Sequence, residues 1–444
     1  MNFESFCQDN HMTTESKKVP ECFESDSILV NDIYYDTDKL SETHPGGSLF
    51  VELFGGRDAT EAFHAYHRRP FPHASMEAYK HELPLHTRPE RATITDDVLY
   101  MDLCKEVNQV CPINKSFAPV YYYVKAASLL CMAGILEYFI HSTGKYTMLN
   151  TSVLGFLFAL IGLNIQHDAN HGSISRYFWV NRILGLTQNW IGGSAVDWMH
   201  QHIVQHHVHC NDVFCDPDIV GNDYLRLNPM MPVRFWNIFQ AFYVGFLFSL
   251  FGFFYSMESL RHYYEMRNFT PYCSYIENHI NIDRLVSAIF LSRWIIFPIF
   301  FSEYPVLQTF VQIFPLLGVG GYYLSFFFIL SHNYHGVLQY DTDYGQKMGL
   351  VKRQVLTSSN VGGSLLCELN GGLNYQIEHH LFPRIHHSHY LKIAPIVKAF
   401  CEKHRIRYTH FPTIIENVWS CMNHLTHMSL CIYYENGREK EKED

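Results

Sequence analysis

Three clusters of histidines alternate with long apolar stretches, and this alternation limits the folds that the chain can adopt. The clusters are HDANH at 167–171, QHIVQHH at 201–207 and QIEHH at 376–380. A helix needs ~20 mostly apolar residues to cross a bilayer, and the stretches near that length are 120–141, 147–166, about 235–257, 285–301 and 305–331. Aromatic residues make up 16% of the chain and charged residues only 17%, as is typical of membrane proteins. We therefore expect an α-helical membrane protein.

Histidines that share a metal centre must lie on one face of the membrane, so an even number of crossings must separate the second and third clusters. Three apolar stretches fill that interval. The last two are joined by a SEYP turn without Lys or Arg, as expected of a loop on the far face, although Arg293 is costly inside such a span. We predict about four transmembrane helices, with 120–141 and 147–166 as one hairpin, 285–301 and 305–331 as the second, and 235–257 as an interfacial helix.

The spacing within the clusters is typical of metal ligands. His167 and His171 are four residues apart, as are His202 and His206, and this spacing places both side chains on one face of a helix. Imidazole binds iron, zinc and copper, and a structural zinc ion takes only four ligands. The clusters supply seven histidines, more than one such ion binds, and they therefore predict two metal ions. The seven candidate ligands are His167, His171, His202, His206, His207, His379 and His380.

Two carboxylates stand inside the clusters, and other histidines lie outside them. Asp168 and Glu378 are expected to orient imidazoles through their ring N–H groups. His200 and His209 are expected at the surface or behind the ligands. Isolated histidines such as His424 are expected to make ordinary polar contacts.

A second metal-binding pattern lies near the N-terminus, in HPGGSLFVELFGGRDATEAFHAYH at 44–67. His44 and His67 are placed to bind a haem iron from opposite faces, with His64 as the alternative to His67. Two imidazoles fill both axial positions, which favours electron transfer over oxygen binding. The glycines allow the backbone to approach the porphyrin closely.

This segment resembles cytochrome b5 over roughly residues 28–90, and the resemblance implies a small α+β domain that binds haem b. The chain departs from the usual pattern of such domains in one respect. No Trp occurs before residue 179, whereas these domains commonly begin with a Trp-bearing strand.

The order of the three histidine boxes, with the stretches NIQHDANHGSIS and NYQIEHHLFPRI, resembles the membrane fatty-acid desaturases. The cytochrome b5-like segment and Gln376 at the head of the third box match their front-end subgroup. The resemblance implies a di-iron centre of two Fe ions held by the seven box histidines, with His332 as an extra ligand and His335 as its competitor. Gln376 is expected either to bind iron weakly or to position its neighbours.

The resemblance also implies the reaction. A cis double bond would be inserted into a polyunsaturated fatty acyl chain, on a lipid or on CoA, between an existing double bond and the carboxyl end. O2 is the oxidant, and a separate NADH-dependent cytochrome b5 reductase would re-reduce the haem. The QHDANHGSIS and DPD stretches favour Δ5 or Δ4, with Δ6 and Δ8 left open. The alternatives are a sphingoid long-chain-base desaturase, a lipid hydroxylase and, in a different class, a non-catalytic haem electron carrier.

Charge and cysteine usage bear on location. The formal charge of -10 gives no basic surface for nucleic acid. The twelve cysteines form no CxxC pair, as expected of reduced thiols facing the cytosol. We predict a multi-pass protein of the endoplasmic reticulum membrane, with haem domain and histidine boxes facing the cytosol. The expected divisions are a disordered N-terminus at 1–27, a haem domain at 28–90, a connector at 91–119, a desaturase domain at 120–410 and a tail at 411–444.

Overall fold

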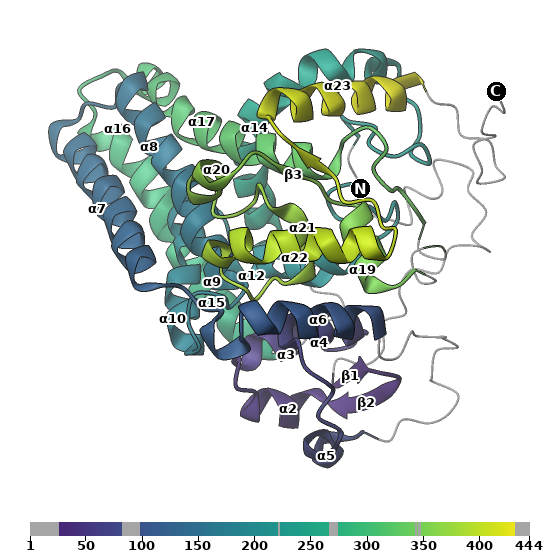
Figure 1. The fold of residues 1–444 in the computed structure, drawn as a ribbon. Helices are drawn as coiled ribbons and strands as arrows, with labels where there is room; N and C mark the ends of the chain where they lie inside the picture. Colours follow the sequence, from purple (N-terminus) through teal and green to yellow (C-terminus); the bar gives the residue numbers. More distant parts are fainter. Residues whose placement is uncertain are drawn as a thin grey trace.

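The computed structural model describes residues 26–81, 98–220, 223–265, 274–341, 344 and 348–430. It is mostly helical, with long helices on one side and a small α+β domain at one end (Figure 1). This agrees with the predicted fold class. Nearly all of the N-terminal segment predicted to be disordered lies outside the described residues.

The small domain begins with an antiparallel hairpin of β1 (Ser27–Val30) and β2 (Ile33–Asp36). The two residues between the strands, Asn31 and Asp32, have φ of 50° and 59°, which suits a tight hairpin turn. Asp36 then caps the next helix by accepting from the Lys39 backbone N–H at 2.9 Å. The helices that follow are α2 (Thr37–Thr43), α3 (Ser48–Leu53), α4 (Thr60–His67) and α5 (His73–Met76), drawn in purple at the bottom of Figure 1.

Two helical hairpins lie side by side, as the sequence predicted. The first joins α7 (Val120–Thr143) to α8 (Met148–Ile161). The second joins α15 (Ser274–Leu291), a π-helical turn η8 (Ser292–Ile296) and α16 (Phe297–Phe301) to α17 (Val306–His332). The Gly144 carbonyl in the first turn accepts from the Glu303 backbone N–H in the second at 3.1 Å. The two turns therefore occupy the same end of the helices, away from the histidines.

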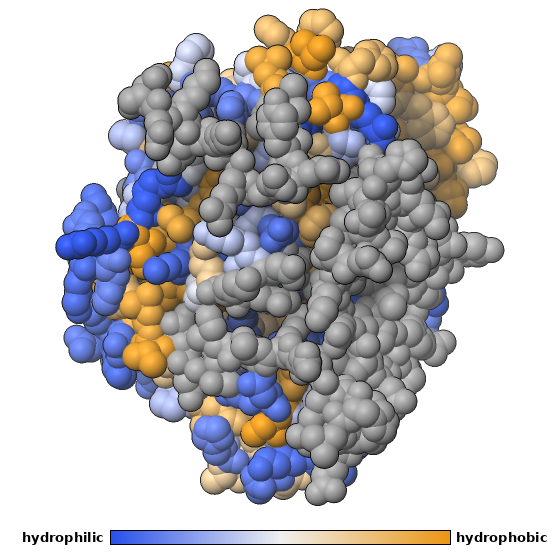
Figure 2. All heavy atoms as spheres, turned by 90° about the vertical axis from the view of Figure 1, so that its right-hand side faces the viewer, coloured by the Kyte–Doolittle hydropathy of each residue, from blue (hydrophilic) through white to orange (hydrophobic). Residues whose placement is uncertain are grey.

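Five helices among the described residues are long and apolar enough to cross a membrane: Val120–Thr143, Met148–Asn170, Phe235–Arg261, His279–Phe301 and Val306–His332. The third covers most of α14 (Gln240–Glu265) and contains the stretch predicted to lie in the interface. That placement stays a prediction. Apolar surface gathers at the top and upper right of the face in Figure 2, while polar side chains lie at its left and bottom.

Glycines let α17 pack closely on α8 and α14. A Cβ on Gly155 of α8 would collide with the Leu316 carbonyl oxygen of α17. A Cβ on Gly252 of α14 would lie 2.6 Å from the Leu317 carbonyl oxygen, and one on Gly321 would collide with the Gly252 backbone. Small residues allow such close approach, which is the usual basis of helix packing in membranes.

Arg293 lies inside a predicted membrane-spanning stretch, where an unpaired charge would be costly, and the structure pairs it fully. Its Nε and Nη2 donate to the two Glu137 carboxylate oxygens of α7 at 2.5 and 2.6 Å. The guanidinium also lies 3.5 Å from the centre of the Trp190 ring. A bidentate ion pair with a cation–π contact offsets the cost of burying both charges. The pair therefore fastens η8 to α7.

The C-terminal part forms a cap over the ends of the long helices. Its members are α19 (Leu350–Leu356), α20 (Ser364–Leu369), α21 (Gln376–Leu381) and α22 (Tyr390–Lys403), and α6 (Val98–Val110) of the predicted connector shares their apolar core. A short parallel pair joins β3 (Asn360–Val361) to β4 (His410–Phe411). In place of the tail predicted from residue 411, α23 (Ile414–Leu430) packs with buried Cys421 and Leu425 into a core shared with α14.

We predict that Gly252→Ala destabilises the fold, because the added methyl group has no room beside Leu317. Forcing a methyl group into a filled contact costs about 1–3 kcal/mol, so the apparent melting temperature in lipid nanodiscs should fall. Gly245→Ala on the same helix is the control, since nothing lies within 4 Å of its added Cβ. Equal melting temperatures for the two variants would contradict the packing described for α14.

Candidate functional site

The histidine boxes lie on irregular helical segments. A π-helical turn, η5 (Gly162–Gln166), runs directly into α9 (His167–Asn170), which holds the first box. The second box begins in a longer π-helical segment, η6 (Met199–His206), and ends in α13 (His207–His209). The third box forms α21. Such π-helical turns occur frequently at functional sites because they re-aim side chains.

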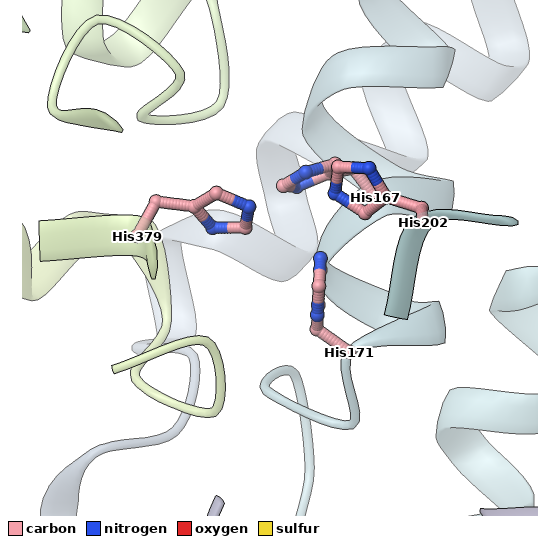
Figure 3. Close-up of side chains that lie close together, drawn as sticks. All are labelled: His167, His171, His202 and His379. Carbon is pink, nitrogen blue, oxygen red and sulfur yellow. The ribbon is translucent and has the colours of Figure 1, made fainter. Parts of the chain in front are cut away.

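One group of four histidines draws on all three boxes. The ligand nitrogens of His167, His171, His202 and His379 lie within 4.8 Å of one another, and all four residues are buried. The ring centres of His167 and His379 are 4.5 Å apart, and those of His171 and His379 are 4.7 Å apart. Figure 3 shows the four imidazoles converging on one space, with His379 facing the other three.

A second group lies beside the first. It consists of His206, His332, His380 and Cys210, again buried and with ligand atoms within 4.8 Å of one another. Sequence reasoning missed Cys210, although it follows His206 by four residues. The first two boxes have the same four-residue histidine spacing, but their histidines are grouped differently. His167 and His171 enter one group, whereas η6 sends His202 and His206 to different groups.

His207 lies between the two groups. Its Nε2 is 3.2 Å from His202 Nε2 and 3.0 Å from His379 Nε2. Its ring stacks on that of His380 at 4.3 Å. The structure thus brings all seven box histidines together with His332.

The sequence left open the role of Gln376 and the choice between His332 and His335 as the extra ligand, and the structure shows different surroundings for Gln376 and His335. The side-chain Nε2 of Gln376 lies 2.9 Å from His332 Nε2, and Gln376 Oε1 is buried without a hydrogen-bond partner among the described residues. His335 lies elsewhere, with its backbone N–H donating to Ser420 at 3.0 Å and its ring 6.5 Å from that of His427. The geometry favours His332 over His335 as the extra ligand.

The partners that orient the imidazoles differ from those predicted. Asp168 bonds to His387 at 2.5 Å, and Glu378 accepts from Asn360 and Tyr408 at 2.7 and 2.8 Å. Asp168 therefore orients an imidazole, as predicted, but that of His387 and not of a box histidine. The prediction was wrong for Glu378, whose carboxylate bonds to an amide and a phenol. The Nδ1 partners seen for the grouped histidines are Tyr66 for His171, Asp216 for His206, Thr357 for His332, Tyr390 for His379 and Gln354 for His380.

Asp216 belongs to the DPD stretch at 216–218, so the sequence contained this signal. Its carboxylate lies 3.1 Å from His206 Nδ1. Burial lowers the pKa of His206, but the carboxylates of Asp216 and Asp218 outweigh it and raise that pKa to about 9. A metal would have to replace the Nε2 proton of this imidazole, and the carboxylate at Nδ1 would then orient the ring toward the metal.

The buried nitrogens fit a bound metal pair. His167 has no hydrogen-bond partner at either ring nitrogen among the described residues, and His171 Nε2, His207 Nδ1 and His380 Nε2 also lack one. Buried polar atoms without partners are costly, and metal bonds would satisfy them. Burial also lowers pKa values well below the usual range, which keeps the imidazoles neutral as metal ligands must be; the residues so affected are His171, His202, His207, His379 and His380.

The small domain holds a second candidate site. The rings of His44, at the end of α2, and His67, at the end of α4, are 6.1 Å apart and nearly perpendicular. Carbonyl oxygens of Gly47 and Phe63 accept from the two Nδ1–H groups at 3.1 and 2.8 Å. Each Nε2 therefore keeps its lone pair for an iron between the rings. His64 instead bonds to Asn31 at 3.1 Å.

Glycine is required beside His44. A Cβ on Gly46 would lie 2.8 Å from the His44 ring, and Gly47 has φ of +95°, where side chains are strained. The Phe63 ring stacks on His67 at 4.2 Å. The residues present therefore suit a haem held by two histidines.

Comparisons with known proteins agree with this geometry. The fatty acid desaturase family model matches residues 146–412, and the cytochrome b5-like heme/steroid binding domain matches residues 23–87. The chain is 41% identical to acyl-lipid (7-3)-desaturase of Diacronema lutheri over 94% of this chain and 93% of that protein. It is 42% identical to acyl-lipid (7-3)-desaturase of Rebecca salina over 90% of each. It is 26% identical to acyl-lipid (8-3)-desaturase of Physcomitrium patens over 89% of this chain and 85% of the relative.

The chain therefore belongs to the fatty acid desaturases, and its desaturase domain is fused to a cytochrome b5-like domain. It resembles acyl-lipid front-end desaturases along most of its length. It is an oxidoreductase whose cofactors are haem in the first domain and a di-iron centre in the second.

We predict that His202→Ala abolishes desaturation and leaves the haem absorbance unchanged, because His202 lies with the grouped histidines and away from His44 and His67. His335→Ala is the matched control, since its side chain lies outside both groups. Product and absorbance are measured on the same membrane preparation. Full activity in His202→Ala would contradict the metal assignment.

A second variant tests the partner of His206. Asp216→Asn keeps the size of the side chain but removes the charge beside Nδ1, so iron retention or activity should fall roughly 10–100-fold. Asp223→Asn is the control, because the Asp223 carboxylate pairs with Arg234 at the surface, at 3.6 Å, and belongs to neither histidine group. Iron is measured by elemental analysis after dialysis against a weak chelator. Unchanged iron retention would show that Asp216 does not support the ligand.

Proposed function

We propose that this desaturase inserts a cis double bond at C4 of a polyunsaturated acyl chain carried by a membrane lipid. The observation behind this choice is the pair of relatives at 41% and 42% identity, both named acyl-lipid (7-3)-desaturase. We take the numbers in that name as an existing double bond at C7 and a step of three carbons toward the carboxyl end. Of the two positions that the sequence favoured, these names support Δ4 over Δ5.

We assign the iron ligands from the two groups. His167, His171, His202 and His379 would hold one iron, and His206, His332 and His380 the other, with His207 between them. Gln376 lies beside His332 and would adjust the second site. When bound, the iron pair supplies the oxidising power that removes hydrogen from an unactivated methylene group.

The protein's own residues orient the ligands and exclude water. Three imidazoles are held at Nδ1 by polar side chains. The partner is Asp216 for His206, Gln354 for His380 and Tyr390 for His379. The buried Trp198 ring packs 4.4 Å from His202 and 5.5 Å from His167. A dry, fixed cluster limits the side reactions of reactive oxygen species with water and protein.

The fused haem domain would deliver the electrons. Each turnover consumes one O2, two electrons, two protons and two hydrogens of the acyl chain, and it yields one double bond and two waters. One haem passes one electron at a time, so it must be reduced twice, and we propose an NADH-dependent cytochrome b5 reductase as its donor. Fusion raises the local concentration of haem to the millimolar range expected of a short tether.

We propose the endoplasmic reticulum membrane as the location, with both cofactor sites on the cytosolic face. The five apolar helices support a membrane protein. The described cysteines form no disulfide, Cys210 and Cys401 among them, as suits the reducing cytosol. The divisions at 28–90 and 120–410 remain our proposed domain limits.

Regiochemistry is tested by expression in yeast fed two polyunsaturated acids. In one the double bond nearest the carboxyl group is at C7, and in the other it is at C8. We expect a new bond at C4 in the first acid and none in the second, with positions mapped by mass spectrometry. The His202→Ala variant gives the background.

Product from the C8 acid alone, with the new bond at C5, would overturn the Δ4 proposal and leave the front-end class intact. A short isotope pulse separates the carriers. We expect labelled product to appear first in phospholipid, whereas first appearance in acyl-CoA would overturn the lipid-linked substrate.

A further inference from the structure

We propose that Tyr66 is a positioning residue that couples the haem to the di-iron centre through His171. This inference rests on the ligand set given under Proposed function. Tyr66 directly precedes the haem ligand His67 on α4. Its hydroxyl lies 2.7 Å from His171 Nδ1, in the first histidine box.

The geometry suits an imidazole that binds iron through its other nitrogen. His171 Nε2 points into the first group and has no hydrogen-bond partner among the described residues. Iron at Nε2 requires the proton on Nδ1, so Nδ1–H would donate to the Tyr66 oxygen. Tyr66 thereby fixes both the tautomer and the direction of the ring.

The same contact closes a connected path between the cofactors. Neighbouring residues on a helix point in different directions, so His67 faces His44 while Tyr66 faces the desaturase domain. The path from the His67 ring runs through the α4 backbone and the Tyr66 side chain to His171. It consists of covalent bonds and one hydrogen bond.

Contacts around Tyr66 hold the two domains in this arrangement. Phe50 of α3 packs 5.7 Å from the Tyr66 ring and also lies against Gly172, which follows His171. An apolar cluster continues the interface: Leu49 and Leu53 of the haem domain share it with Val196, Met199 and Ile203 next to the second box.

Polar contacts surround that apolar centre. Arg57 bonds to His200 at 3.1 Å, which gives this histidine beside the second box a role in docking. Glu61 pairs with Arg353 of α19. On the far side of α4, Arg68 donates to the Asn108 side chain at 2.9 Å and to the Cys111 carbonyl at 3.0 Å. Charged and polar pairs on both sides of Tyr66 therefore fix its register against His171.

The step that Tyr66 serves is a one-electron transfer. The haem held by His44 and His67 would give up one electron and become ferric, and one iron of the oxidised pair that His171 helps to hold would take up that electron and become ferrous. The reductase that restores the haem is the electron source in the cell. No atom moves between the domains, so the hydroxyl acts through position and hydrogen bonding alone.

The test uses the full-length, iron-loaded protein in nanodiscs without oxygen or substrate. A light flash with a photosensitiser reduces the haem, and its absorbance reports the loss of the electron to the irons. Tyr66→Phe removes the hydroxyl and keeps the ring. We expect at least a tenfold slower decay in this variant, measured on protein loaded to the wild-type iron content and with the haem spectrum unchanged.

Tyr79→Phe is the matched control, because it loses a hydroxyl of the same domain that contacts Thr43 at 2.9 Å and lies away from His171. Its decay should equal that of the wild type. Wild-type decay in Tyr66→Phe would overturn the proposal. Loss of iron with normal haem would also overturn the coupling role and leave Tyr66 as a support for His171 alone.

The outcomes separate this inference from the proposed function. The flash experiment contains no acyl substrate, so a different regiochemistry leaves its result unchanged. Haem decay in the wild type that does not depend on iron would overturn the ligand set and the coupling together. Slow electron transfer in Tyr66→Phe, with wild-type transfer in Tyr79→Phe, supports the ligand set and the coupling role of Tyr66.

Discussion

The burial of eight imidazoles in one small space is the constraint on which the rest of the structure depends. Box histidines and His332 bring their ring nitrogens together in the interior, and several of those nitrogens have no hydrogen-bond partner among the described residues. Such a cluster is unfavourable as bare protein. Two bound irons would relieve this cost, because each ligand ring would bind metal through one nitrogen. The other nitrogen of His171, His206, His332, His379 and His380 already contacts a polar group of the protein.

The surrounding architecture serves that cluster. The glycine contacts of α8, α14 and α17 bring the helix ends close enough for His332 to meet the second and third boxes. The Glu137–Arg293 pair fastens the two hairpins far from the site. The cap from α19 to α22 contributes His379 and His380 and closes the cluster from the other side. The haem domain docks on the remaining face through Tyr66, so a single chain places an electron donor beside the oxidant.

Much of this site could be predicted because most candidate ligands stand within short sequence motifs. Short motifs named the box histidines, His44 and His67 as candidates, and the family resemblance named His332; the structure brings the box histidines and His332 together. The helical hairpins follow from apolar length. The division of the histidines into two groups could not be predicted, since π-helical η6 changes the direction of His202 relative to His206. The partners Asp216, Gln354 and Tyr390 lie outside the boxes, 10, 26 and 11 residues from the histidines that they contact, so no spacing within a box points to them. Asp168 and Glu378 stood beside ligands in sequence yet turn toward other residues, because adjacent side chains on a helix diverge.

The central claim is that the grouped histidines hold two irons in addition to the haem. The most direct measurement is the ratio of total iron, by elemental mass spectrometry, to haem, by its alkaline pyridine spectrum, on purified full-length protein. The account predicts three irons for each haem, one inside the porphyrin and two outside it. A ratio of one, or zinc in place of the two further irons, would contradict it.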